Sequence, residues 1–344
     1  MNRAATTLSS VWNDLQHEAL RLGAIRAGAT PLVDRNVERF AEWLSRGSEA
    51  GMAYLRRNLA TRHNPLQRFP WGRSVVVILV PYFPEREHAP TGSLSNGLAR
   101  YAQGDDYHDV VDAMLRRLEM LLTTLAEGTK SWRYVDTGPF SDRSLAAQAG
   151  LGWIGKNGML IDPEIGSYFF IGTLVTSLVH DLDVAEVTDR CGDCTRCIDA
   201  CPTGAIDRAR FVDSNRCISY LTIEHRGAID PELSNHLAGN GFGCDICQEV
   251  CPWNAHAPEG HEAFRTRAGY SGHPITDLIA LTQADFSSLF KGSAVKRAKR
   301  AGMIRNAILA AGTVDAETLA AAGSEADEGI RAAVATRKRD SLRQ

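Results

Sequence analysis

The residues with the clearest chemical potential are eight cysteines, all of which lie between Cys191 and Cys251 of a 344-residue chain. Residues 191–202 read C-x2-C-x2-C-x3-C-P, the run by which bacterial-type ferredoxins bind 4Fe-4S clusters. Residues 244–252 repeat this run without its first cysteine, and Cys217 supplies the absent thiolate. The eight thiolates therefore provide four ligands for each of two 4Fe-4S clusters.

The spacing also predicts which thiolates share a cluster, because the cysteine before the proline binds the other cluster in such paired runs. The first cluster takes Cys191, Cys194, Cys197 and Cys251, and the second takes Cys201, Cys217, Cys244 and Cys247. Paired C-x2-C motifs also bind structural zinc. Two near-copies of the longer run favour two clusters instead, and clusters that share ligand segments lie close enough for electron transfer.

Composition and charge bound the class of protein. With 44% hydrophobic and 23% charged residues, the chain is typical of a globular protein of two or three domains. Its net charge of -3 gives no overall attraction to nucleic acid or membranes. The N-terminal segment lacks the apolar core of a signal peptide, and no run approaches the roughly 20 apolar residues of a membrane span. We therefore expect a cytoplasmic protein without a membrane partner, in which clustered cysteines bind metal.

The elements that must position a redox site are predicted to form a mixed α/β domain over residues 1–185. Residues 1–70 read as helical, and the apolar run 74–81 predicts a strand that is buried on both faces. Further along, we expect a long helix from Asp106 to Leu125, a strand at 133–135, a helix at 142–150, a glycine-rich loop at 150–158 and strands at 159–162 and 168–178.

Two other domains are expected to follow. Residues 186–260 form a cluster domain with little apolar core, which metal must hold together. Residues 261–344 are helical, with helices expected at 277–281, 285–290, 294–312 and after Asp315, and they resemble the short stacked helices of helical-repeat proteins. Within 286–314 there are basic residues but no acidic ones, a pattern that fits either a solvated helix face or a patch that contacts nucleic acid.

Two single residues are ambiguous from the sequence alone. Asp136 follows a strand at the turn Asp-Thr-Gly-Pro, so it either forms the turn or takes part in catalysis. Lys156 closes a Gly-x-Gly-x-x-Gly-Lys run and is either a solvated lysine or a contact to a phosphate or amide-rich cofactor. The run precedes a strand and is therefore not a dinucleotide fingerprint. Residues 106–108 begin like the Asp-x-His-x-x-Gly motif of cobalamin proteins, but Val111 replaces its glycine, so this route supplies no lower histidine ligand.

Several long strings resemble the epoxyqueuosine reductases, the family that completes the modified base queuosine in tRNA. The resemblance covers nearly the whole chain and is carried by residues 52–58, 74–77, 100–108, 135–139, 152–157, 172–174, 216–224 and 243–254. It implies a reductase with base-off cobalamin in the α/β domain, a ferredoxin-like two-cluster module and a HEAT-like C-terminal domain. Electrons would pass from an external donor such as a flavodoxin or ferredoxin through the clusters to cobalamin. The epoxide of the wobble nucleoside would then be reduced.

The resemblance also implies roles for individual residues. Asp136 becomes the proton donor and lies at the cobalamin site, since a leaving oxygen must be protonated. The remaining cobalamin contacts become Arg57, Tyr101 and Lys156. The anticodon stem-loop of the tRNA would lie on a basic helix, through Lys296, Arg297, Lys299, Arg300 and Arg305. The chain is expected to act as a monomer.

Two other functions compete with this interpretation. A reductive dehalogenase would share the clusters and cobalamin, but the chain lacks a twin-arginine export signal and has a basic C-terminal segment. A non-enzymatic electron carrier would leave the α/β domain and the C-terminal helices without a purpose.

Overall fold

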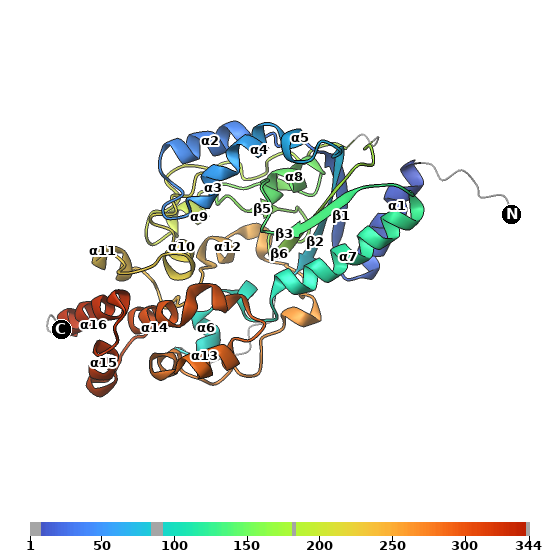
Figure 1. Ribbon diagram of the computed structural model, residues 1–344. Helices are drawn as coiled ribbons and strands as arrows, with labels where there is room; N and C mark the ends of the chain where they lie inside the picture. The colour runs from blue at the N-terminus through green and yellow to red at the C-terminus, as the bar shows by residue number, and fades with distance from the viewer. Residues whose placement is uncertain (1–7, 84–91, 181–183, 342–344) are drawn as a thin grey trace.

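The structure is a computed structural model and describes residues 8–83, 92–180 and 184–341 (Figure 1). Its α/β part contains a four-stranded sheet in the order β1-β2-β6-β3, in which all neighbouring strands are antiparallel. The strands are β1 (Arg26–Pro31), β2 (Ser74–Pro81), β6 (Phe169–Thr176) and β3 (Ser131–Val135).

Strand β2 is buried along its whole length. Successive side chains of a strand point to opposite faces of the sheet. Accordingly, Val75, Val77 and Leu79 pack in one core, while Val76 and Ile78 pack in the other. The apolar run 74–81 thus forms the doubly covered strand that the sequence predicts.

Helices α1 (Leu8–Arg21) and α7 (Tyr107–Leu125) cover one face of the sheet (Figure 1). Helix α7 begins where the Asp106 carboxylate accepts a hydrogen bond from the backbone N–H of His108 at 3.1 Å. Its buried stripe consists of Val111, Met114, Leu115, Leu118 and Leu122. The cap and the stripe together fix the first turn of α7, which carries Tyr107, at the edge of the sheet.

The second face of the sheet packs against α8 (Asp142–Gln148) and a small antiparallel pair, β4 (Trp153–Ile154) and β5 (Leu160–Ile161). The N-terminal part of the chain adds four short helices beside this layer, namely α2 (Val37–Ser45), α3 (Tyr54–Arg57), α4 (Leu59–His63) and α5 (Pro65–Arg68).

The cysteine-rich region consists of short turns of helix joined by loops: α9 (Arg196–Asp199), α10 (Ile218–Ile223), α11 (Pro231–Ser234), α12 (Ile246–Glu249) and η2 (Pro252–Asn254). In Figure 1 most of these turns lie between the sheet and the C-terminal helices. Within the described part of the chain, Phe242 is the region's only member of the three large buried cores. Seven further apolar residues of the region are buried outside these large cores: Ala205, Ile206, Phe211, Ile218, Leu221, Ile229 and Leu237. The region therefore has a small apolar core that is separate from the three large ones.

The C-terminal region is helical and has a core of its own. Its elements are η4 (Ile275–Ala280), α13 (Gln283–Leu289), η5 (Ala294–Ala298), α14 (Lys299–Ala310), α15 (Ala316–Gly323) and α16 (Glu328–Ser341). This core also takes in Leu94 on α6 (Leu94–Gly97), Leu98 just after that helix and Phe242. Residues 94–102 thus pack with the C-terminal helices, although they precede α7 in the sequence.

Three expectations about local structure were wrong. Residues 26–31, expected to be helical, form β1, which pairs with β2 from Arg26 opposite Leu79 to Pro31 opposite Ser74. The glycine-rich loop contains the short strand β4. The single helix expected at 294–312 is divided between η5 and α14. Among the residues described, no helix combines the length and the apolarity that crossing a bilayer requires.

Candidate active site and iron-sulfur module

Asp136 stands at the end of β3 in a strained conformation. Its φ of 55° lies in the left-handed region, which is uncommon for residues other than glycine although Asp is among the better tolerated. The N–H of Thr137 donates to the carbonyl of Val135 at 2.6 Å and closes the turn. The Asp136 side chain is exposed, and its Oδ2 accepts a hydrogen bond from the Tyr107 hydroxyl at 2.8 Å. The turn therefore presents a carboxylate at a fixed position.

A group of aromatic rings holds Tyr107 in place. Its ring stacks on Phe170 with centroids 4.4 Å apart and planes 3° apart, and on His108 at 4.1 Å. Tyr101 meets Tyr107 edge-on at 6.1 Å. Burial, reinforced by the charge of Asp136, raises the pKa of both tyrosines, so Tyr107 remains a neutral hydrogen-bond donor to the carboxylate.

Groups from two other parts of the chain face Asp136. Arg297 on η5 forms a two-pronged ion pair with Glu224, from Nε at 2.8 Å and Nη2 at 3.0 Å. The hydrogen bond to Glu224 is the main cause that raises the pKa of Arg297, and Asp136 contributes. Burial raises the pKa of Tyr54 on α3, with contributions from Glu224 and Asp136. The site is thus bordered by the sheet, α3 and the C-terminal region.

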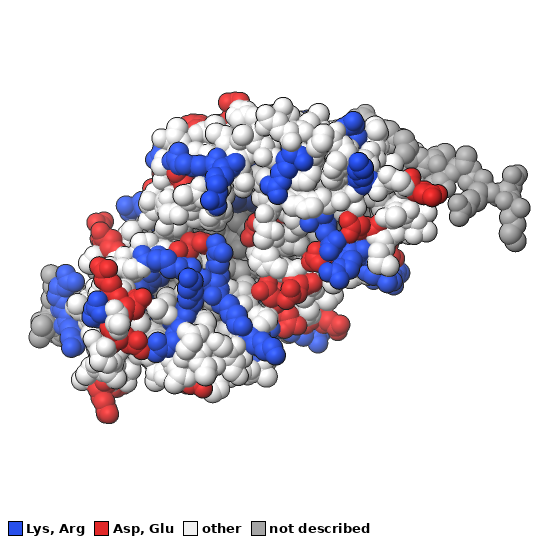
Figure 2. All heavy atoms as spheres, viewed as in Figure 1, with Lys and Arg blue, Asp and Glu red and all other residues white. Residues whose placement is uncertain are grey.

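The molecular surface agrees with this arrangement. Figure 2 shows a hollow near the middle of the face, with Lys and Arg side chains gathered on both sides of it. Strand β3 runs toward this hollow in Figure 1. A hollow bordered by cations suits an anionic ligand.

A second carboxylate lies near Asp136 on α8. Oδ1 of Asp142 accepts a hydrogen bond from the hydroxyl of Thr173, a fully buried residue, at 2.9 Å. Burial, and then the charge of Asp136, raise the pKa of Asp142 to about 7. Near neutral pH, Asp142 is therefore partly protonated.

The structure separates the residues predicted to contact cobalamin. Tyr101 and Asp136 lie in the same region, since the charge of Asp136 raises the pKa of Tyr101. Arg57 is exposed on α3 and makes no ion pair with any residue of the described chain. Lys156 lies instead against the cysteine run, where its Nζ donates to the carbonyl of Gly192 at 2.6 Å.

Four cysteines line one cavity of about 400 Å³, together with Lys156, Asn157, Ile161, Arg190, Arg196, Pro252 and Trp253. They are Cys191, Cys194, Cys197 and Cys251. The indole N–H of Trp153 points to the sulfur of Cys191 at 3.5 Å. Burial raises the pKa of Cys197, and the neighbouring charges of Cys251, Cys191 and Cys194 raise it further.

The other four cysteines, Cys201, Cys217, Cys244 and Cys247, form a second neighbourhood. Burial raises the pKa of Cys244 to about 12, and the charges of Cys217 and Cys201 contribute. Burial also raises the pKa of Cys247 well above its ordinary value, with Cys244 as the next cause. The backbone N–H of Ala205 donates to the sulfur of Cys201 at 3.3 Å. Thiols that are shielded from water and whose charges act on one another suit a bound metal centre, which deprotonates them.

In the basic segment, the structure corrects the predicted tRNA contact at Arg305 and modifies the one at Arg300. Arg305 is only 2% exposed, and its guanidinium donates to the carbonyls of Leu221, His225 and Gly227 at 2.7, 3.1 and 2.8 Å. It is therefore a structural residue and not part of a tRNA surface. Arg300 donates to Leu281 and Glu325, and is half-buried.

The lysines of the same segment differ from these arginines. Lys296 and Lys299 are exposed, and neither has an ion-pair partner among the residues that the structure describes. Arg297 is exposed as well, but it is paired with Glu224. These three cations are the part of the predicted surface that remains accessible.

Sequence reasoning missed Tyr54, Tyr107 and Asp142. Two of them lie within strings that carry the family resemblance, since Tyr54 belongs to 52–58 and Tyr107 to 100–108. Their side chains gained a role only when the structure placed them beside Asp136. The sequence indicated nothing about Asp142 except that it is the first residue of a predicted helix.

Comparison with known proteins agrees with this geometry. Residues 190–254 match the 4Fe-4S double cluster binding domain, and residues 62–137 match the family Epoxyqueuosine reductase QueG, DUF1730. The epoxyqueuosine reductase of Cellulophaga algicola is 36% identical over 302 residues, which are 85% of this chain and 95% of that protein. The one from Synechocystis sp. is 39% identical over 278 residues, 80% and 94% of the two chains.

Solved structures give the same result. A crystal structure of an epoxyqueuosine reductase with an epoxyqueuosine-modified tRNA-Tyr stem loop has a TM-score of 0.86 and 29% identity, covering 96% of this chain and 89% of that one. The Bacillus subtilis enzyme, solved with its catalytic aspartate loop swung out of the active site, has a TM-score of 0.84 and 28% identity, covering 96% and 90%.

The mixed α/β fold and the eight-cysteine 4Fe-4S double cluster domain define an iron-sulfur oxidoreductase. The identity to relatives over nearly their whole length is more specific. The chain belongs to the epoxyqueuosine reductase family.

Proposed function

We propose that this chain reduces epoxyqueuosine to queuosine at the wobble position of tRNA, in the last step of queuosine biosynthesis. The observation that carries the proposal is the strained, exposed Asp136, which Tyr107 holds at the end of β3 in a site bordered by the sheet, α3 and the C-terminal region. Strain of this kind persists where the surroundings impose it, and it concentrates at functional sites. The relatives share the fold around this position.

Asp136 is the proposed proton donor. Converting the epoxide to an alkene consumes two electrons and two protons and releases the oxygen as water. The carbon–oxygen bonds break more readily when the departing oxygen is protonated, and an exposed carboxyl group can supply that proton. The Tyr107 hydroxyl orients the carboxylate through Oδ2, which leaves Oδ1 free to face the substrate. In the Bacillus subtilis relative, the loop with the catalytic aspartate has been seen outside the active site.

The two cysteine neighbourhoods are the proposed ligand sets. Cys191, Cys194, Cys197 and Cys251 would bind the first 4Fe-4S cluster. Cys201, Cys217, Cys244 and Cys247 would bind the second. The shared cavity of the first set and the mutual electrostatic effects within each set support this division. N–H groups directed at sulfur, from Trp153 and Ala205, are groups that tune such clusters.

Base-off cobalamin is the proposed electron acceptor at the active site, and the donor set fits it. Arg57, which has no ion-pair partner among the residues that the structure describes, suits its phosphate, and the aromatic rings around Tyr101 and Tyr107 suit a broad, flat macrocycle with amide side chains. Bound cobalamin would supply a strongly reducing metal centre for the cleavage of the carbon–oxygen bond. Arg57, Tyr101 and Asp136 would contact it, whereas the place of Lys156 beside Gly192 favours a role at the first cluster.

The accessible cations of the C-terminal region are the proposed tRNA contacts. Lys296, Arg297 and Lys299 lie in the C-terminal region, where Arg297 is close enough to Asp136 to feel its charge, and exposed cations can neutralise backbone phosphates. A related structure contains an epoxyqueuosine-modified stem loop. An external flavodoxin or ferredoxin would supply the electrons.

The wider organisation is proposed as well. The cobalamin domain would cover residues 1–185, the cluster domain 186–260 and a HEAT-like tRNA-binding domain 261–344, except that 94–102 packs with the last of these. Since the substrate is a tRNA, the reaction would take place in the cytoplasm, with the protein acting as a monomer.

One assay tests the proposal. Oxygen-protected protein loaded with iron, sulfide and cobalamin is mixed with a reductant and epoxyqueuosine-containing tRNA, and the released nucleosides are analysed by mass. We expect the substrate to lose one oxygen atom and become queuosine. Fully loaded protein that leaves the epoxide unchanged would overturn the proposed function.

A further inference from the structure

The two cysteine sets differ in how close to the surface they lie. In the loop of the first set, Arg190, Gly192, Asp193, Thr195 and Arg196 are all exposed. In the segment of the second set, residues 241–243, 245 and 248 are buried. The first set is thus the outer one and the second set the inner one.

The inner set also adjoins the active site. Gly243, which precedes Cys244, packs so closely on Ala99 and the Tyr101 ring that a side chain at this position would meet both. Tyr101 in turn contacts Tyr107, which holds Asp136. Electrons that reach the second cluster are therefore next to the site where they are used, and the first cluster is the end that faces solvent.

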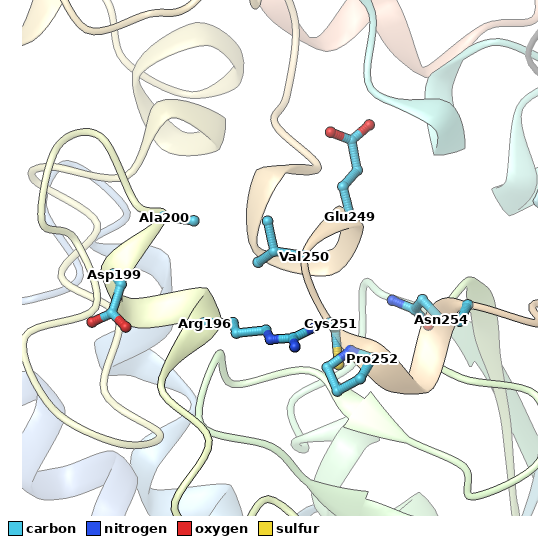
Figure 3. A pocket seen from close by; sticks show the side chains of 9 residues that line it. Arg196, Asp199, Ala200, Glu249, Val250, Cys251, Pro252 and Asn254 are labelled. Atoms are coloured by element: carbon cyan, nitrogen blue, oxygen red, sulfur yellow. The ribbon is translucent and has the colours of Figure 1, made fainter.

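The surface next to the outer set of cysteines also contains a pocket. A pocket of about 660 Å³ opens beside Cys251, between α9 and η2 (Figure 3). Its lining includes the apolar side chains of Ala200, Val250 and Pro252. Arg196 extends from α9 across the pocket toward Cys251. A concave, partly apolar surface next to a redox centre is suited to the projecting cofactor edge of another protein.

The charge around the outer set is positive. The cavity of its four cysteines is lined by Lys156, Arg190 and Arg196 and by no carboxylate. Neither Arg190 nor Arg196 forms an ion pair with a residue that the structure describes.

Two of the nearby carboxylates are paired with arginines, Asp189 with Arg210 and Glu249 with Arg100, which lies 3.6 Å away. Asp199 accepts a hydrogen bond from the Thr195 hydroxyl at 2.7 Å but keeps its charge, and Asp193 is exposed. Asp199 and Glu249 line the pocket beside Cys251. Among the described residues, the three cations Lys156, Arg190 and Arg196 outnumber these two carboxylates without a paired cation, Asp193 and Asp199, so the net charge at this end is positive.

We propose that this face, formed by Arg190, Arg196, Lys156 and the pocket beside Cys251, is the docking site for a small acidic electron-transfer protein. The inference rests on the proposed function and adds the place and the charge of the electron donor. The reduced carrier, with a flavin or iron-sulfur centre, is oxidised by one electron and the first cluster is reduced. Two encounters supply the two electrons of a turnover. Weak, small interfaces steered by opposite charge are typical of such partners.

The rival explanation is that these cations only offset the negative charge of the cluster. The two explanations differ in which reductant is affected. Docking concerns a protein donor alone, whereas an effect on the cluster would appear with any donor.

The test uses cluster-loaded, full-length protein and follows the bleaching of the clusters' visible absorbance after rapid mixing, without tRNA or cobalamin. The variant is Arg190→Glu with Arg196→Glu, and Lys130→Glu, an exposed cation at the start of β3, is the matched control. The two donors are reduced flavodoxin, which is acidic, and reduced methyl viologen, a small cation. Iron and sulfide per chain are measured first, so that only fully loaded protein is compared.

With flavodoxin, we expect the double variant to be reduced at least about tenfold more slowly at low salt, and to lose most of the parent's salt dependence. With methyl viologen, the clusters of the double variant should be reduced at the parental rate. The Lys130→Glu variant should be reduced at the parental rate with both donors. Parental rates with flavodoxin, or an equal loss with both donors, would overturn the docking site. Because no substrate is present, these results do not depend on whether the nucleoside assay succeeds.

Discussion

At the scale of single residues, the site is organised around Asp136, whose backbone conformation is restricted by the turn in which it lies. The turn at Asp136 imposes a left-handed conformation, and the stacked ring of Tyr107 supplies a donor that does not ionise near neutral pH. The side chain is therefore held in place before substrate arrives. Preorganisation of this kind lowers the cost of reaching the reactive geometry.

The first prediction concerns the proposed proton donor. Asn accepts the left-handed conformation as readily as Asp, so Asp136→Asn should leave the fold intact. It removes the transferable proton, and we expect the rate of queuosine formation to fall by about 10²–10⁴-fold. The rate is measured by nucleoside mass analysis, and thermal unfolding of the loaded variant serves as the control. A variant that works at the parental rate would exclude the assignment.

The second prediction concerns Asp142. Its pKa is raised from 3.8 to about 7 in the folded chain, first by burial and then by the charge of Asp136. Between these two pH values the folded state binds a proton that the unfolded state has lost. The contribution of Asp142 to stability is therefore greatest below about pH 4, declines as the pH rises, and is fully lost above about pH 7.

Substitution by Asn should remove this contribution to the pH dependence. The midpoint of urea unfolding of the loaded protein, measured from pH 5 to pH 8, should decline less steeply for Asp142→Asn than for the parent. Asp14→Asn, at an exposed position of α1, should follow the parent. Equal slopes in all three proteins would show that Asp142 does not titrate in this range.

At the scale of elements, some helices and strands follow from the local sequence pattern, whereas others depend on contacts with distant parts of the chain. The apolar run of β2 and the capped start of α7 are local signals, and both elements formed where the sequence indicated. Strand β1 has no such signal: its sequence RAGATP contains small residues, and only its pairing with β2 makes it a strand. The cysteine spacing was informative because metal ligands obey short, fixed separations.

The basic segment shows the limit of sequence patterns. Six cations without an intervening acid suggested a surface, but a linear pattern cannot show where unpaired carbonyls of another segment will lie. Helix α10 and the chain after it bring the carbonyls of Leu221, His225 and Gly227 to α14, where the guanidinium of Arg305 donates hydrogen bonds to them. Burial lowers the pKa of Arg305 to about 10, so it still carries its charge at neutral pH.

The third prediction separates the structural and surface cations of this segment. Arg305→Met leaves one buried and two partly buried carbonyls without their donor and should lower the free energy of unfolding by about 3 kcal/mol. Lys296→Ala should leave stability unchanged and weaken tRNA binding, with a shallower dependence on salt. Chemical denaturation and filter binding measure the two effects. If Arg305→Met were as stable as the parent, its structural role would be disproved.

At the scale of the whole molecule, the cysteine-rich region connects two parts that each have an apolar core, while it has little of its own. Its stability must therefore come from bound metal and from its contacts to either side. The sequence indicated this dependence through its composition. It could not indicate that the region also forms part of the border of the active site, because that follows from how the three parts pack.

The fourth prediction follows from this dependence. Removing iron and sulfide with a chelator should increase hydrogen exchange across residues 190–254, while β2 and β6 at the centre of the sheet keep their protection. Mass spectrometry of peptides from loaded and stripped protein measures both regions in one sample. Unchanged exchange in the cysteine-rich region after complete loss of iron would contradict the prediction.

The packing of α6 has a consequence for the synthesis of the protein on the ribosome. Leu94 and Leu98 are covered by Ile275, Leu278 and their neighbours, which are synthesised much later. Until those residues emerge, the nascent chain carries bare apolar side chains in front of α7, and these are targets for holding chaperones. This part of the molecule can therefore close only after the chain has been made beyond residue 278, which follows the last cysteine, Cys251.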